Sequence, residues 1–220
     1  MSEKIPYTTV LFDLDGTLTD PEIGITTCFQ HALKYFGIEE NDRAKLRRVI
    51  GPPLLDSFVQ FYGLSVEDAQ LGIKYYRERF SDIGIFENTV YDGIPEMLNE
   101  LKAAGKKLVL ATSKPHVYAK RILEHFDLAQ YISFVAGSEF DGTRTDKAEV
   151  IRYALEQTGT SPEEAIMVGD RKHDVIGAIQ NNVAVIGVLY GHGGEEELTK
   201  AGTSLLAKTP EELTQMLLHM

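Results

Sequence analysis

Asp13 and Asp15 lie two residues apart in the segment Asp13-Leu14-Asp15-Gly16-Thr17-Leu18. Two carboxylates at this spacing are candidate catalytic groups. The apolar residues 8–12 before them are typical of a buried parallel strand. Side chains alternate along a strand, so both carboxylates would share one face at the edge where open α/β sheets bind ligands. The two carboxylates repel each other unless a cation or a shared proton offsets their negative charge. The pair therefore points to a bound cation, and to an electrophile on which the acids act.

The plain alternative is a solvated Asp-x-Asp-Gly turn after an ordinary strand, because Asp and Gly are common turn residues. Three further polar groups argue against it, since two of them directly follow an apolar segment and the third, Lys147, opens a predicted helix. They are Thr112-Ser113-Lys114-Pro115, Lys147 after Thr143-Arg144-Thr145-Asp146, and Gly169-Asp170-Arg171-Lys172-His173-Asp174. Parallel strands would bring all four groups to one edge of the sheet.

The elements that must position these residues alternate between strands and helices in the second half of the chain. We expect strands at 107–112, 134–137, 165–168 and 184–188, and helices at 118–125, 147–157, 175–181 and 210–219. The alternation predicts an α/β fold, a doubly wound Rossmann-like parallel sheet with helices on both faces.

Residues 21–86 contain no convincing strand and show helical patterns at 25–36, 43–50, 54–62 and 66–80. A helical block of this length exceeds an ordinary crossover between strands. We therefore expect an α/β core built from residues 1–20 and 87–220, with a helical cap inserted at 21–86.

Composition limits the classes of partner. The 220 residues include 22 Lys and Arg against 33 Asp and Glu, a formal charge of −11 that disfavours nucleic-acid polymers and anionic membranes. The single cysteine, Cys28, excludes an internal disulfide and fits a reducing compartment. The N-terminus lacks the apolar core of a signal peptide, and no stretch approaches a membrane span. We expect a soluble, cytoplasmic protein.

The four motifs together resemble those of the haloacid dehalogenase-like phosphohydrolases, in the order and with the separations typical of that family. They are Asp13-x-Asp15-Gly16-Thr17, Thr112, Lys147 and Gly169-Asp170-x-x-x-Asp174. The helical insert is similar to the family's cap, so the resemblance spans nearly the whole chain. It implies that Asp13 is the nucleophile that forms an aspartyl-phosphate, and that Asp15 is the general acid and base.

The same resemblance implies a phosphate-binding set and a metal. Thr112 would donate its hydroxyl to the phosphoryl group beside the Ser113 N–H, and Lys147 would add a positive charge. The oxygen donors of Asp13, Asp170 and the Asp15 main-chain carbonyl suit Mg²⁺, with Asp174 as a ligand through water or as an anchor behind the ligands.

Substrate choice is expected to sit in the cap, in the turn Arg47-Arg48-Val49-Ile50-Gly51-Pro52-Pro53. Arg47 is a candidate for binding a substrate carboxylate or second phosphate, and Gly51 permits an unusual backbone; a solvated arginine at a helix end is the alternative. The Ile-Gly-Pro-Pro-Leu segment resembles phosphoglycolate phosphatase-like and 5′-nucleotidase-like members.

We therefore expect a Mg²⁺-dependent phosphatase acting on a small phosphorylated metabolite, as a monomer or weak dimer. A sugar phosphomutase, a phosphatase acting on phosphotyrosine and a phospho-accepting receiver domain remain alternatives. The Asp15 side chain in acid/base position and the insert after the first strand both count against a receiver domain.

Overall fold

The structure is a computed structural model that describes residues 7–220, and the chain divides into two compact units. One unit comprises the chain up to Thr19 and again from Val90 to Met220, and the other is Asp20–Thr89. From the sequence, the two boundaries were expected after residues 20 and 86.

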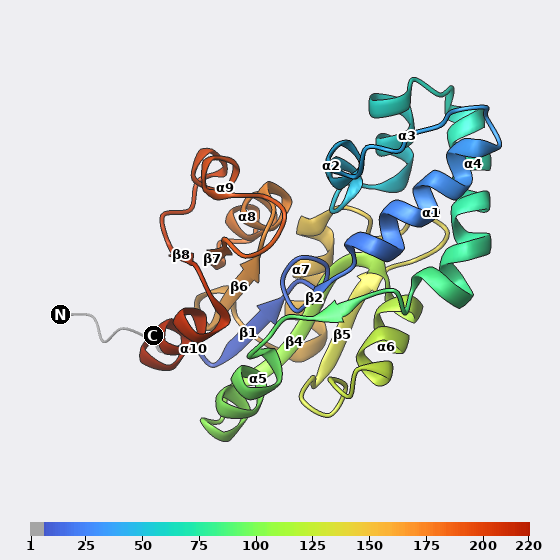
Figure 1. The fold of residues 1–220 in the computed structure, drawn as a ribbon. Coiled ribbons are helices and arrows are strands. Elements are labelled where there is room, and N and C mark those ends of the chain that lie inside the picture. The colour runs from blue at the N-terminus through green and yellow to red at the C-terminus, as the bar shows by residue number, and fades with distance from the viewer. Residues whose placement is uncertain (1–6) are drawn as a thin grey trace. The chain divides into compact units, whose positions relative to one another are not determined.

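The first unit is built on a six-stranded sheet in which every neighbouring pair of strands is parallel (Figure 1). Strand β1 (Thr9–Phe12) is central, with β4 (Lys107–Pro115) on one side and β6 (Ala165–Gly169) on the other. The order across the sheet is β5 (Phe134–Ser138), β4 (Lys107–Pro115), β1 (Thr9–Phe12), β6 (Ala165–Gly169), β7 (Ala184–Val188), β8 (Leu206–Ala207). This arrangement confirms the predicted α/β parallel-sheet fold.

Both faces of the sheet are buried, which explains why the strands read as continuous apolar runs. Leu11 and Met167 belong to one core cluster with Val150 of α7 (Lys147–Thr158) and Val175 of α8 (Lys172–Gln180). Alternation turns Phe12 to the opposite face, where it is equally buried. The helices of this unit are α5 (Ile94–Ala103), α6 (His116–His125), α7 (Lys147–Thr158), α8 (Lys172–Gln180), α9 (Glu195–Ala201) and α10 (Pro210–His219).

Two helices and one strand of this unit were absent from the sequence-based expectation: α5, α9 and β8. Helix α5 begins after Gly93, which has a positive φ, and carries a proline in its first turn. Helix α9 opens with three consecutive glutamates and has only one buried residue, Leu198, so it shows almost no apolar periodicity. Strand β8 is two residues long and is defined by its pairing with β7.

The second unit is helical, with α1 (Glu22–Lys34), α2 (Arg43–Leu46), α3 (Leu54–Tyr62) and α4 (Val66–Arg79). Its core is aromatic: the Phe29 ring lies 4.5 Å from Phe58 and 5.5 Å from Tyr76 between centroids. Ser65 caps α4 by accepting the Asp68 N–H. The short strands β2 (Thr19–Asp20) and β3 (Thr89–Val90) form a separate two-stranded sheet.

No helix within residues 7–220 combines the length and the apolar character that crossing a bilayer requires.

Candidate active site

Asp13 lies at the carboxyl end of β1, where its main-chain N–H donates to the Val168 carbonyl of β6 at 2.9 Å. Lys147 reaches it from the first residue of α7, a helix that Asp146 caps by accepting the Ala148 N–H. The Lys147 Nζ lies 2.8 Å from Asp13 Oδ1 and 3.0 Å from the Ala111 carbonyl oxygen, to which it donates. The helix start thus delivers a buried positive charge to the end of the central strand.

The same ammonium group also lies 2.7 Å from Asp174 Oδ1. Burial alone would lower the pKa of Lys147, but the carboxylates of Asp13 and Asp174 raise it above its ordinary value. Lys147 therefore stays charged, which a buried lysine does only when it is paired.

Asp170 and Asp174 follow β6 and are both buried. Asp170 Oδ2 accepts the His192 main-chain N–H at 2.7 Å, and Asp174 Oδ2 accepts the Arg171 N–H at 3.0 Å in the first turn of α8. Asp170 Oδ1 is buried and has no hydrogen-bond partner among the described residues. Each carboxylate is thus held through one oxygen by a main-chain N–H.

The charge balance of this cluster favours a bound cation. One carboxylate oxygen from each of Asp13, Asp170 and Asp174 lies within 4.8 Å of the others, and Lys147 supplies a single compensating charge. Burial, then repulsion from Asp174 and Asp13, raises the pKa of Asp170 well above its ordinary range. Burial also raises the pKa of Asp174, to about 6, with Lys147 acting in the opposite direction. An all-oxygen donor set with excess negative charge and an orphaned oxygen fits Mg²⁺.

Two glycines let the backbone approach Asp170 closely. Gly16 has a φ of +84°, and a Cβ there would overlap the Asp170 carboxylate. A Cβ at Gly191, in the loop after β7, would overlap the Gly16 carbonyl oxygen and the Asp170 Cβ. The loop from β7 is thereby packed directly onto Asp170, beside the His192 N–H that binds it.

Asp15, predicted as the general acid and base, is paired with a residue to which the sequence analysis gave no role. Lys114 Nζ donates to Asp15 Oδ1 at 2.7 Å. Burial raises the pKa of Asp15, Lys114 acts in the opposite direction, and the Asp13 charge adds to the rise. Lys114 belongs to the segment Thr112-Ser113-Lys114-Pro115, which follows the strand expected at 107–112. The sequence therefore indicated where Lys114 lies, but it did not indicate that Lys114 pairs with Asp15.

Thr112 and Ser113 lie at the end of β4, next to Lys114. The buried Thr112 Oγ1 accepts the Lys114 main-chain N–H at 3.3 Å, and the Ser113 carbonyl accepts the Ser138 hydroxyl at 2.8 Å. The structure therefore brings Asp13, Lys147, Asp170 and Asp174 into one cluster, and puts Thr112 and Ser113 on the strand beside β1.

The predicted cap residues have partners within their own unit. Arg47 Nε donates to Glu22 Oε2 at 2.9 Å, and the Arg47 side chain is 60% exposed. Arg48 donates to the Phe61 carbonyl at 3.1 Å and its guanidinium lies 4.7 Å from the centre of the Phe61 ring. Gly51 is exposed with a φ of +102°. Arg48 is thus held by packing, whereas Arg47 is largely accessible.

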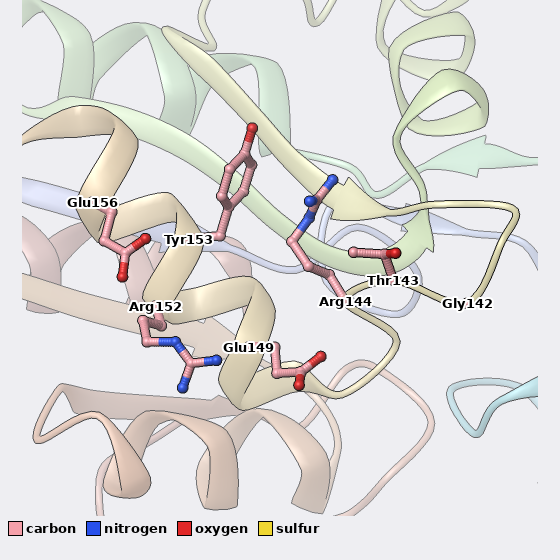
Figure 2. A pocket seen from close by; sticks show the side chains of 7 residues that line it. All are labelled: Gly142, Thr143, Arg144, Glu149, Arg152, Tyr153 and Glu156. Carbon is pink, nitrogen blue, oxygen red and sulfur yellow. The ribbon is translucent and has the colours of Figure 1, made fainter.

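A separate depression of about 450 Å³ lies on the outer side of α7 (Figure 2), lined by Gly142, Thr143, Arg144, Glu149, Arg152, Tyr153 and Glu156. One of its two arginines, Arg144, already contacts Glu139, the Gly137 carbonyl and the face of the Tyr153 ring. It shares no lining residue with the acidic cluster.

Comparisons with known proteins find similar sequences and similar structures. Residues 10–188 match the family model described as haloacid dehalogenase-like hydrolase. A Pseudomonas aeruginosa protein named 5′-nucleotidase is 51% identical over 87% of this chain and 87% of its own length. A Mycobacterium tuberculosis protein named tyrosine-protein kinase PtkA is 40% identical over 94% of this chain and 72% of its own. A Clostridium acetobutylicum structure described as a predicted phosphatase superposes with a TM-score of 0.95 at 47% identity, covering 98% of this chain and all of that one.

Proposed function

The chain belongs to the haloacid dehalogenase-like hydrolases, and we propose that it is a Mg²⁺-dependent phosphatase of small phosphate monoesters. The observation that carries the proposal is the cluster of three buried carboxylates around Lys147, one of which keeps an orphaned oxygen. When bound, Mg²⁺ supplies positive charge to the phosphoryl oxygens of the substrate. Asp13, Asp170 and Asp174 would hold it, together with the Asp15 main-chain carbonyl.

The reaction would proceed in two steps on the residues of the core unit. Asp13 attacks phosphorus to form an aspartyl-phosphate, and the bond from phosphorus to the leaving oxygen breaks. Asp15 gives its proton to that oxygen and then takes a proton from the water that hydrolyses the intermediate. Lys147 orients Asp13, while the Thr112 hydroxyl and the Ser113 N–H bind phosphoryl oxygens.

As the substrate class we propose nucleoside 5′-monophosphates. The support is the relative named 5′-nucleotidase, which shares half of the aligned residues over most of both chains. In a panel assayed with Mg²⁺, kcat/KM should be higher for AMP than for 2-phosphoglycolate. A higher kcat/KM for 2-phosphoglycolate would be consistent with the proposed phosphatase activity but would overturn the proposed substrate class.

A second candidate is chemistry on tyrosine phosphate, which the 40% identity to the protein named tyrosine-protein kinase PtkA favours. Phosphotyrosine in the same panel, and ATP with a tyrosine peptide, test this directly. Hydrolysis of AMP without action on either would exclude it.

The decisive test is steady release of phosphate from p-nitrophenyl phosphate, with Asp13→Asn as the inactive variant. Asp127→Asn is the matched control, because Asp127 is exposed and its φ of +56° suits asparagine. Phosphate release that stops after one equivalent would indicate a receiver domain, and a requirement for an added bisphosphate would indicate a phosphomutase. Equal activity in the Asp13→Asn variant would overturn the covalent mechanism.

A further inference from the structure

Lys114 is a second buried lysine at the catalytic edge of the sheet. Its side chain is 7% exposed, that of its partner Asp15 is 14% exposed, and the two are joined by the 2.7 Å contact between Lys114 Nζ and Asp15 Oδ1. Burying an ammonium group is costly unless it is paired, so this pair must form in the folded core unit. Lys147 already serves Asp13 and Asp174. Lys114 thus pairs with a carboxylate that Lys147 does not contact.

The backbone that carries Lys114 is held by the neighbouring strand and not by the ion pair. The register between β4 and β5 shifts between Ala111 and Pro115, which re-aims the end of β4. A Cβ at Gly137 would lie 2.8 Å from the Lys114 carbonyl oxygen, so glycine permits this close approach. The Ser138 hydroxyl also donates to the Ser113 carbonyl. Changing the Lys114 side chain should therefore leave the strand end in place.

The role of Asp15 in the proposed reaction explains why a charge at this position would matter. Asp15 begins the first step carrying a proton and ends it as a carboxylate, so negative charge appears on its side chain as the leaving group departs. A fixed ammonium 2.7 Å away stabilises that charge and holds the carboxyl group in one orientation.

We propose that Lys114 is the positioning residue for Asp15, orienting its carboxyl group and compensating the charge it acquires when it protonates the leaving oxygen. The inference rests on the proposed function. As the bond from Asp13 to phosphorus forms, the bond from phosphorus to the leaving oxygen breaks, and the proton on that oxygen comes from Asp15. Lys114 keeps its three protons throughout.

The test compares Lys114→Met, which removes the charge, with Lys114→Arg, which retains it. The substrates are phenyl phosphate and p-nitrophenyl phosphate, which have similar shapes but differ in how strongly the leaving oxygen needs a proton. Lys107→Met is the matched control, because Lys107 lies exposed at the opposite end of the same strand. All variants are first compared with wild type by circular dichroism and thermal unfolding.

For Lys114→Met we expect kcat/KM on phenyl phosphate to fall roughly 10- to 100-fold, as for loss of one charge-assisted contact to a catalytic acid. The fall on p-nitrophenyl phosphate should be much smaller, because nitrophenolate leaves without protonation. Lys114→Arg should restore part of the lost rate, and Lys107→Met should match wild type. In an Asp15→Asn background, Lys114→Met should cause no further loss on phenyl phosphate.

Equal losses on the two esters would assign Lys114 to structure, and a rise in KM with kcat unchanged would assign it to substrate binding. Losses that add to those of Asp15→Asn would show that Lys114 acts independently. Each of these three results overturns the inference while leaving the phosphatase intact. Failure of the wild-type protein to release phosphate from either ester would instead overturn the proposed function, and this inference with it.

Discussion

Lys147 Nζ lies 2.8 Å from Asp13 Oδ1, and both side chains are buried at the carboxyl end of the central strand. The contact depends on two local features, the strand that ends at Phe12 and the helix that begins at Lys147. Because the same ammonium group also contacts Asp174, one side chain links the end of β1 to the first turns of α7 and α8. Lys147 is therefore expected to matter for both the fold and the reaction.

Replacing Lys147 by Met should abolish phosphate release and destabilise the protein. Removing one partner of a buried ion pair leaves uncompensated carboxylates and costs about 3–5 kcal/mol. Urea unfolding and release of phosphate from p-nitrophenyl phosphate measure the two effects. Lys200→Met is the control, because the Lys200 side chain is 74% exposed in its pair with Glu196 and should change neither quantity. A fully active Lys147→Met variant would show that Lys147 takes no part in the reaction.

Mg²⁺ should stabilise the protein, and more strongly at pH 7 than at pH 5. Protons and the metal compete for the same carboxylates, and burial holds the pKa of Asp174 at about 6 and that of Asp170 well above its usual range. At 100 times its Kd, the ion should add about 2.7 kcal/mol to the free energy of unfolding. Urea unfolding at both pH values, with Mg²⁺ or with EDTA, measures this difference.

The metal-free protein should show the opposite trend at this site. An unfolded aspartate has a pKa of about 3.9, so between about pH 4 and pH 6 native Asp174 binds a proton that the unfolded chain does not. The contribution of Asp174 to stability therefore decreases as the pH rises through this range. Asp174→Asn removes that titration, so its stability relative to wild type should increase from pH 4 to pH 7. A constant difference would contradict the raised pKa.

Gly191→Ala should weaken Mg²⁺ binding. A Cβ at this position would overlap both the Gly16 carbonyl oxygen and the Asp170 Cβ, so the loop must withdraw and take the His192 N–H away from Asp170. Calorimetry should show a Kd for Mg²⁺ raised by about tenfold or more, the scale of losses at groups supporting metal ligands.

Gly105→Ala separates this effect from general strain. Gly105 has a φ of +81°, but a Cβ added there would meet no heavy atom within 4 Å, so alanine should lower stability and leave Mg²⁺ affinity unchanged. Equal Mg²⁺ affinities for wild type and Gly191→Ala would show that the loop does not support Asp170.

The fold could be predicted from the sequence because both faces of the sheet are buried. Continuous apolar strands such as β7, and helices with a clear apolar face such as α10, were expected at the residues where they occur. Helix α9 was missed because it buries little, and β8 because two residues carry no periodic signal. Patterns in a sequence record burial, so elements with little burial leave little pattern, whereas α5 was missed although it buries Ile94, Met97, Leu98 and Leu101.

Part of the candidate active site could be predicted from the sequence for a similar reason. Residues directly after buried strands, such as Asp13 and Asp170, can be assigned to one sheet edge from topology alone. The pairing of Lys114 with Asp15 could not, because it depends on the register shift at the end of β4, and a shift of this kind has no clear signature in the residues. Nor does the spacing of residues show that the loop after β7 returns to Asp170.

Arg47→Ala should change substrate selection without changing the chemistry or the fold. The Arg47 side chain is 60% exposed in its ion pair with Glu22, so loss of the pair should barely affect unfolding. We expect kcat/KM to fall roughly 10- to 100-fold on esters with a second anionic group, the scale of one lost charge-assisted hydrogen bond. Activity on p-nitrophenyl phosphate should be retained. Lys45→Ala, an exposed change in the short helix just before Arg47, is the matched control and should alter neither class of substrate. An equal fall in kcat/KM on all esters would indicate that Arg47 acts only through the general electrostatic field. Unchanged values would indicate that other residues recognise the substrate.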